Sequence, residues 1–290
     1  MSVGNSVQRA KVMSQISVPG YVIVKKIAEG GSSEIYKARR QPYNKEVALK
    51  VLRPKFIDNK KMIRAFDQEA DILQRCQHKN IIKINKIVKG GKSPAIDMEL
   101  CETTHLKRYI SKSVGKGNIL PLPEACAIFT QVIDALSYLH HDLSIVHKDL
   151  KPENVLVNKE GLVKLIDFSI AIEVKTGFFS KLFAKEPKPE GTPTYLSPEQ
   201  IAGKFVDQRA DIYSFSVMAF EIFSGRPPIT GRTMSELLMA HVKQRAPSIL
   251  SVRKDLPKDL ATIIDRSLSK RPEDRPGDIN NIGEILKKYC

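Results

Sequence analysis

Tryptophan is absent from this 290-residue sequence, and its four cysteines are too far apart to form a C-x-x-C pair. Neither a zinc site nor a disulfide framework is therefore indicated. The N-terminus has no apolar core behind basic residues, and Ser2 follows Met1 where myristoylation would need glycine. The most apolar stretch, Ile212 to Phe223, is too short to span a bilayer and contains Glu221. We expect a protein of the reducing cytoplasm, with no membrane span in this chain.

The net charge of +15 is spread along the chain and forms no Lys/Arg block long enough to resemble a nucleic-acid arm. A solvated basic surface is therefore favoured over a nucleic-acid binding module, which rests on net charge alone. Hydrophobic residues make up 42% of the chain and charged residues 27%, which is typical of a packed globular protein. The length allows one large domain or two coupled lobes.

The pattern of apolar residues changes along the chain. Residues 1–18 are polar without a clear period, and we expect an arm there. Short β-branched runs predict antiparallel strands at 21–27, 35–39, 47–52, 81–88 and 95–98, with one helix at 60–76. Helical spacing then predicts helices at 124–140 and 211–223, the second of them buried on nearly all sides. The sequence therefore predicts an α+β protein whose second part is mainly helical.

Lys50 occupies an unusual position for a lysine. Strand alternation places it on one face with Ala48 and Leu52, while helical spacing places Glu69 on the apolar face of the 60–76 helix. An inward lysine and an inward glutamate would pair, because a buried charge is very costly without a partner. The alternative is that both side chains reach the surface.

The segment 147–154, H-K-D-L-K-P-E-N, packs three chemically useful side chains into one short loop. Such a loop can present Asp149 to accept a hydroxyl proton, Lys151 to neutralise a transferring phosphoryl group, and Asn154 to offer an amide oxygen to magnesium. Asp167 ends the strand predicted at 163–166, where a hard cation could also bind. The structural alternative for the segment 147–154 is a polar turn, and the alternative for Asp167 is a strand-end cap.

Taken together, these segments resemble the protein kinase family. The motifs occur in the family's order: V-A-L-K, the helix glutamate, H-K-D-L-K-P-E-N, D-F-S, G-T-P-T-Y-L-S-P-E and D-I-Y-S-F-S-V. The resemblance runs from about Tyr21 to the end, and the closing segments are similar to bacterial Hanks-type kinases. It implies a bilobal α+β kinase domain at 19–290, behind an N-terminal arm at 1–18. Within it, a small antiparallel β lobe with one helix would occupy 19–98, a hinge 99–105 and a larger, mainly helical lobe 106–290.

The resemblance also implies an activity. Lys151 and the G-T-P-T-Y segment are similar to serine/threonine kinases, so the implied reaction transfers the γ-phosphate of ATP to serine or threonine hydroxyls of proteins, including autophosphorylation. The implied catalytic residues are Lys50, Glu69, Asp149 and Lys151. Asn154 and Asp167 would hold magnesium, for which manganese is an alternative.

The implied nucleotide contacts form a larger set. It consists of Ala28, Glu29, Gly30, Gly31, Ser32, Ser33, Ile35, Ala48, Lys50, Met98, Glu99, Cys101, Asn154, Leu156 and Asp167. Met98 would be the gatekeeper, and Glu99 and Cys101 would act through their backbone groups. Structural roles are implied for a buried Glu199–Arg275 pair, for Asp211 as a brace of the catalytic loop, and for Thr192 as a contact of Asp149 and Lys151.

Three motifs depart from the family pattern. The glycine-rich loop at 28–35 reads A-E-G-G-S-S-E-I in place of G-x-G-x-x-G-x-V, so Ala28 and Ser33 are expected to stiffen it and weaken nucleotide binding. Ser169 replaces the glycine of D-F-G, which removes no catalytic group. Lys148 replaces the arginine of H-R-D, and an ammonium cannot form a bidentate pair with a phosphate. The sequence therefore does not predict that activity depends on phosphorylation of the activation loop.

The activation segment contains an apolar and basic stretch at 176–183, T-G-F-F-S-K-L-F. Exposed aromatic residues there would serve docking or self-association, although packing against the large lobe is slightly favoured. Thr176 and Ser180 are candidate phosphorylation sites, with Thr192 and Thr194 as alternatives. Because every charged group needed for phosphoryl transfer is present, we expect an active kinase. The alternative is a pseudokinase-like binding or scaffold protein.

Overall fold

The computed structural model describes residues 17–89, 93–113, 119–174 and 191–290. They divide into two units. The first comprises the described residues of Met1–Gln77 together with Ile82–Glu102, and the second comprises those of His78–Ile81 and Thr103–Cys290. The division after Glu102 falls inside the segment predicted as a hinge. Within the described ranges, no helix combines the length and apolar character that a bilayer crossing needs.

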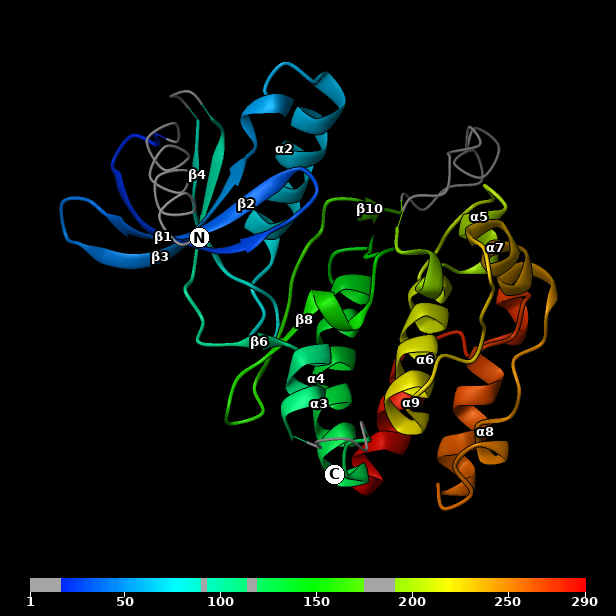
Figure 1. Ribbon diagram of the computed structural model, residues 1–290. Coiled ribbons are helices and arrows are strands. Elements are labelled where there is room, and N and C mark those ends of the chain that lie inside the picture. The colour runs from blue at the N-terminus through cyan, green and yellow to red at the C-terminus, as the bar shows by residue number, and fades with distance from the viewer. Residues whose placement is uncertain (1–16, 90–92, 114–118, 175–190) are drawn as a thin grey trace, which may run out of the picture. The chain divides into compact units, whose positions relative to one another are not determined.

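The first unit is a five-stranded antiparallel sheet accompanied by helix α2 (Lys60–Arg75) (Figure 1). Its strands are β1 (Tyr21–Glu29), β2 (Ser33–Arg40), β3 (Lys45–Leu52), β4 (Ile84–Val88) and β5 (Ala95–Met98), in the spatial order β1-β2-β3-β5-β4. The strands and the helix predicted from the sequence are confirmed, except that β4 begins only at Ile84. Ile81 itself belongs to the second unit, where it forms an isolated bridge to Leu165.

The local sequence explains where α2 lies and how it packs. The side chain of Asn59 accepts hydrogen bonds from the backbone N–H groups of Lys61 and Met62, which satisfies donors that the first turn leaves open. Phe66 and Glu69 are both buried on one face of the helix, as their spacing predicts. Strand β3 is buried from Val47 to Leu52, so side chains on both of its faces are covered. Lys50 is therefore in the interior of this unit.

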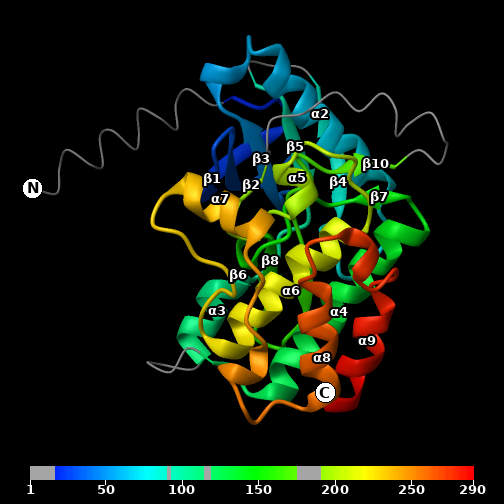
Figure 2. The same cartoon turned by 90° about the vertical axis from the view of Figure 1, so that its right-hand side faces the viewer.

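The second unit is mainly helical. Its helices are α3 (Leu106–Ser113), α4 (Leu122–His141), α5 (Pro198–Ile201), α6 (Arg209–Ser224), α7 (Met234–Lys243), α8 (Lys258–Ser267) and α9 (Asn280–Leu286). Short strands β6 (Thr104–His105), β8 (Val155–Val157) and β9 (Val163–Leu165) form one sheet, and β7 (Ile145–Val146) pairs with β10 (Ile172–Glu173). Figures 1 and 2 show α4, α6, α8 and α9 lying side by side. The predicted α+β class is thereby confirmed.

Helix α6 forms the centre of the second unit. Its residues from Ala210 to Phe220 are all buried, which confirms the prediction of a helix covered on nearly all sides. The ring of Phe129 on α4 meets Phe215 and Phe223 of α6 edge-on, at centroid distances of 5.2 and 5.3 Å. The helix ends at Gly225, whose φ of 77° is readily adopted only by glycine.

Candidate active site

Lys50 and Glu69 form a buried ion pair within the first unit. The Nζ atom of Lys50 lies 2.6 Å from each carboxylate oxygen of Glu69, and the two residues are 9% and 2% exposed. Strand β3 holds the lysine between β2 and β5, where its cross-strand neighbours are Ile35 and Ile96. The carboxylate fixes the direction of the ammonium group, because a charge in this interior position needs a partner. This is the pairing predicted from the faces of strand and helix.

The residues of the altered glycine loop connect β1 to β2. Gly30 N–H donates to the carbonyl of Ser33 at 2.8 Å, and Arg53 N–H donates to that of Ser32 at 3.0 Å. Neither Gly30 nor Gly31 has a positive φ, so this loop conformation does not itself require glycine. The Arg53 guanidinium also pairs with the carboxylate of Glu29. The pKa of Glu29 is below its ordinary value, chiefly because Lys26 donates a hydrogen bond to it and also because of the Arg53 charge.

The other residues predicted to contact nucleotide in the first unit lie on or just after β3 and β5. Ala48 and Met98 are cross-strand partners and are each 6% exposed. The backbone N–H of Glu99 donates to the carbonyl of Lys83 at 2.9 Å, and its side chain accepts from the Lys83 N–H at 2.8 Å. Cys101 is half-buried. The sheet therefore brings Ala48, Met98 and Lys50 onto neighbouring positions of two paired strands.

Asp149 is the most heavily hydrogen-bonded side chain of the loop in the second unit. Its Oδ2 accepts from Lys151 Nζ at 2.6 Å and from the Asn154 amide at 3.1 Å, and its Oδ1 accepts from the Thr192 N–H at 2.9 Å. Lys151 also donates to the Thr192 hydroxyl at 2.6 Å. The residue is 9% exposed. These contacts hold the carboxylate in one orientation beside the described end of the activation segment.

Asn154 and Asp167 come together through the backbone between two strands. The carbonyl of Asn154 accepts from the N–H of Ile166, the residue before Asp167, at 2.9 Å. The Asn154 amide nitrogen also donates to the Asp149 carbonyl at 2.7 Å, so its amide oxygen is the remaining group for a ligand. Asp167 has a φ of 64°, a backbone conformation that is unusual outside glycine. Leu156 lies nearby in β8, paired with Lys164 of β9.

The oxygen donors of Asn154 and Asp167 suit a magnesium ion that also binds phosphate and water, rather than a metal ion held by protein groups alone. The described part of the chain contains no group of three or more His, Cys, Asp or Glu side chains that would hold a metal. Magnesium is usually bound by one or two carboxylates plus substrate phosphates and water, all oxygen donors. An aspartate carboxylate and an asparagine amide oxygen meet that description. Both residues therefore suit a metal that arrives with a phosphorylated ligand.

Asp211 of α6 stabilises the backbone of the catalytic loop, as the resemblance implied. Its carboxylate accepts from the backbone N–H groups of His147 and Lys148 at 2.8 and 2.9 Å, and it is fully buried. Burial alone raises the pKa of Asp211, but the hydrogen bond with the His140 side chain and the hydrogen bond from the His147 N–H help to hold that pKa below its ordinary value. The sequence pattern placed His140 on a helix face and indicated no such support. His140 Nε2 lies 2.9 Å from Asp211 Oδ2, a tertiary contact that the local sequence does not indicate.

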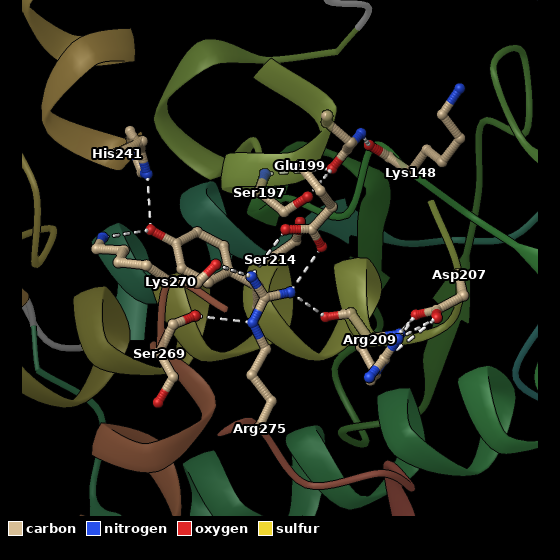
Figure 3. A network of polar contacts seen from close by, with 12 residues as sticks. Lys148, Ser197, Glu199, Asp207, Arg209, Ser214, His241, Ser269, Lys270 and Arg275 are labelled. Atoms are coloured by element: carbon tan, nitrogen blue, oxygen red, sulfur yellow. Dashed lines mark hydrogen bonds and ion pairs between the residues drawn. The ribbon is translucent and has the colours of Figure 1, made fainter. Parts of the chain in front are cut away.

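The Glu199–Arg275 pair lies at the centre of a second buried network (Figure 3). The two guanidinium nitrogens donate to the two carboxylate oxygens at 2.6 and 2.8 Å, and Arg275 is 2% exposed. Gln200, next to Glu199, donates to the Lys148 carbonyl at 2.9 Å. The network therefore connects the catalytic loop with α5 and with the residues before α9.

Some predicted features lie outside the described residues. They are the candidate phosphorylation sites Thr176 and Ser180, and the stretch 176–183 proposed for docking or self-association. The predicted residues that are described gather into two groups, one in each unit. The first contains Lys50, Glu69, Ala48, Met98 and the glycine loop, and the second contains Asp149, Lys151, Asn154, Leu156 and Asp167.

Comparisons with known proteins agree with this geometry. The chain is 33% identical over 266 residues to a probable serine/threonine-protein kinase of Clostridium acetobutylicum, covering 92% of this chain and 39% of that protein. It is 31% identical over 252 residues to the serine/threonine-protein kinase PrkC of Bacillus subtilis, covering 87% of this chain and 38% of that protein. The chain thus spans less than half the length of these relatives.

A solved structure and a family match extend the comparison. The crystal structure of the Mycobacterium tuberculosis PknI kinase domain superimposes with a TM-score of 0.72 at 25% identity, covering 95% of this chain and 98% of that one. The protein kinase domain family matches residues 21–288. Since this match covers nearly the whole chain and the solved kinase domain shares its fold, this chain belongs to the protein kinase domain family.

Proposed function

We propose that this chain transfers the γ-phosphate of ATP to serine or threonine hydroxyls of proteins, itself included. The observation that carries the proposal is the carboxylate of Asp149, held between Lys151, Asn154 and the Thr192 N–H. A carboxylate has about four lone-pair sites, of which these donors take three. The remaining site is on Oδ1, where a substrate hydroxyl can donate. Asp149 would orient that hydroxyl and accept its proton as the oxygen attacks phosphorus.

The other residues would act on charge and position. Lys151 would neutralise the transferring phosphoryl group while it keeps Asp149 and Thr192 together. Lys50, directed by Glu69, would hold the α- and β-phosphates of ATP. Asn154 and Asp167 would hold magnesium, with manganese as an alternative, and the bound ion would neutralise phosphate charge. The glycine loop, the residues of β3 and those at the end of β5 would enclose the nucleotide.

Transfer of labelled phosphate from ATP, with and without magnesium, tests this proposal. Purified chain, alone and with myelin basic protein, is expected to incorporate label with magnesium and to lose it in EDTA. Acid hydrolysis of the product should yield phosphoserine or phosphothreonine. Label on tyrosine would contradict the substrate class. A folded chain that binds ATP but transfers nothing under any metal condition would favour the pseudokinase-like alternative.

Gly191 keeps the space beside Asp149 open, and replacing it with alanine tests that role. Its φ is 125°, and an added Cβ would lie 2.7 Å from Leu196 and 3.5 Å from Asp149 Oδ1. Because the strain of such a conformation is of order 1–3 kcal/mol, we expect Gly191→Ala to reduce phosphate transfer about tenfold or more. The matched control is Gly277→Ala, where no atom lies within 4 Å of the added carbon. Equal rates for both variants would contradict the assignment.

The location and the partners are part of the same proposal. The four cysteines are all free in the described chain, which suits a reducing cytoplasm. The partners would be protein substrates rather than nucleic acid. Self-association through 176–183 stays a proposal, because those residues lie outside the described ranges.

A further inference from the structure

Four charged side chains of the first unit gather beside the altered glycine loop. Lys26 and Glu29 lie on β1, Glu34 lies on β2, and Arg53 directly follows β3. Lys26 Nζ lies 2.6 Å from Glu29 Oε2 and 3.3 Å from Glu34 Oε1. Arg53 Nη2 also pairs with Glu29 and lies 3.8 Å from Glu34 Oε1. Each of the two cations therefore contacts both carboxylates.

A bulge in β1 brings the members of this network together. The pairing of β1 with β2 shifts by one residue between Lys26 and Ala28, so Ile27 is an extra residue on β1. In a regular strand, Lys26 and Glu29 are three positions apart and would point to opposite faces of the sheet. The bulge places both on one face, where their side chains form the 2.6 Å contact.

The network lies on the face of the sheet opposite the predicted nucleotide contacts. Ala28, Ile35 and Lys50 are paired in turn across β1, β2 and β3, so they share one face. Glu34 precedes Ile35 by one residue, and strand alternation therefore places it on the other face. Arg53 contacts Glu34 there, three positions after Lys50. The charges thus approach the glycine loop from the side away from Lys50.

Glu29 and Glu34 are directly opposite each other on the two strands that lead into and out of the loop. Like charges in such positions repel, which favours separation of the strands beside the loop. Lys26 and Arg53 offset this repulsion, and the Tyr36 hydroxyl also donates to Glu34. The Glu34 and Arg53 side chains are only 12% and 18% exposed, so water and salt screen their attraction less than that of a surface pair.

Backbone hydrogen bonds close the same loop. The Gly30 N–H donates to the carbonyl of Ser33 at 2.8 Å, and the Arg53 N–H donates to that of Ser32 at 3.0 Å. Arg53 therefore holds the loop twice, through its backbone and through its guanidinium group. Because Ala28 and Ser33 stand at two of the family's glycine positions, the loop also has fewer conformations to lose when it becomes ordered.

We propose that Arg53 is a positioning residue for ATP, which clamps the glycine loop through Glu29 and Glu34 with the help of Lys26. The inference rests on the proposed kinase function and adds to it the side chains that order the nucleotide loop. An ordered loop loses less conformational entropy when the nucleotide binds, which offsets the loss of the two glycines. The clamp touches no reacting group. Its loss should therefore raise the KM for ATP and leave kcat and the KM for protein nearly unchanged.

Steady-state kinetics with varied ATP, and calorimetric titration with the ATP analogue AMP-PNP and magnesium, test the clamp. Arg53→Met keeps an apolar stem and removes the charge, and we expect it to raise the KM for ATP and the Kd for AMP-PNP about three- to tenfold. Lys26→Met should have a smaller effect, because the Lys26 side chain is 40% exposed. Arg64→Met, at an exposed arginine of α2, is the matched control.

A double variant distinguishes the lost charge from lost packing of the arginine stem. In Arg53→Met the opposite carboxylates of Glu29 and Glu34 lose one of their two counterions, and Glu34→Gln removes one of the two negative charges. Arg53→Met combined with Glu34→Gln should therefore bind AMP-PNP more tightly than Arg53→Met alone. A double variant that binds no better than Arg53→Met would contradict the electrostatic clamp.

Hydrogen exchange of the nucleotide-free chain, followed by NMR, separates this inference from the proposed function. The Gly30 N–H should exchange about three- to tenfold faster in Arg53→Met than in the native chain, while Arg64→Met keeps the native rate. If the native chain binds AMP-PNP but transfers no phosphate, the proposed function fails, whereas exchange and affinity still test the clamp. A folded Arg53→Met variant with native exchange at Gly30 and native affinity for AMP-PNP would overturn the inference.

Discussion

Replacing Asp149 with asparagine is expected to lower kcat for phosphate transfer by about 10²- to 10⁴-fold, the usual contribution of a general base. The amide is nearly the same size, but it cannot accept the proton of the attacking hydroxyl. It also turns an NH₂ group toward one of the present donors, Lys151 Nζ or the Thr192 N–H. Both effects act on the reacting hydroxyl. The KM for ATP should change little, since the residues proposed to bind the nucleotide are untouched.

The kinetic comparison needs a variant with the same charge change elsewhere. Asp255→Asn serves, because the Asp255 side chain is 75% exposed and its ion pair with Arg253 is worth little at such exposure. Steady-state rates of the native chain and of both variants, with thermal melting as the check on folding, decide the matter. A folded Asp149→Asn variant within a few-fold of native kcat would remove Asp149 from its proposed role and, with it, the observation on which the proposed function rests.

The second large effect concerns stability rather than rate. Arg275→Met is expected to destabilise the chain by about 3–5 kcal/mol, because removing one member of a buried ion pair leaves an uncompensated charge. All five N–H donors of this guanidinium are satisfied, by Glu199 twice and by the carbonyls of Ser269, Arg209 and Lys270. Methionine fills most of the volume but satisfies none of these acceptors. The melting temperature should fall by about 10 °C.

Two further variants identify the cause of that loss. Arg271→Met removes an arginine four residues away whose side chain is 70% exposed, and it should cost at most about 1 kcal/mol. The double variant Arg275→Met with Glu199→Gln should be more stable than Arg275→Met alone, because the buried carboxylate is no longer charged. Differential scanning calorimetry measures all three. If Arg275→Met melts at the same temperature as Arg271→Met, or if the double variant is no more stable than Arg275→Met, the uncompensated buried charge is not the main cause of the destabilisation.

The strands and helices that carry the site follow from local patterns. The alternation in 47–52 predicts a strand, and β3 spans Lys45–Leu52. The apolar residues of 60–76 recur at helical spacing, and α2 spans Lys60–Arg75 with Glu69 on its buried face. The predicted start of β4 was wrong. Residues 81–83 have the β-branched composition of a strand, but Ile81 bridges to Leu165 and Asn80 accepts from the Leu165 N–H. That pairing is not encoded within the segment itself.

The α+β class, the order of the motifs and the chemical identity of the groups near Asp149 follow from the amino-acid sequence, because they depend on residue types and short-range spacing. The side chains that support those groups could be identified only from the folded chain. The contacts of His140 with Asp211 and of Tyr213 with His241 join residues 71 and 28 positions apart. The space that Gly191 leaves beside Asp149 likewise depends on Leu196 and on the catalytic loop together. Such contacts arise from packing between elements, and hydrophobic periodicity along one element carries no information about them.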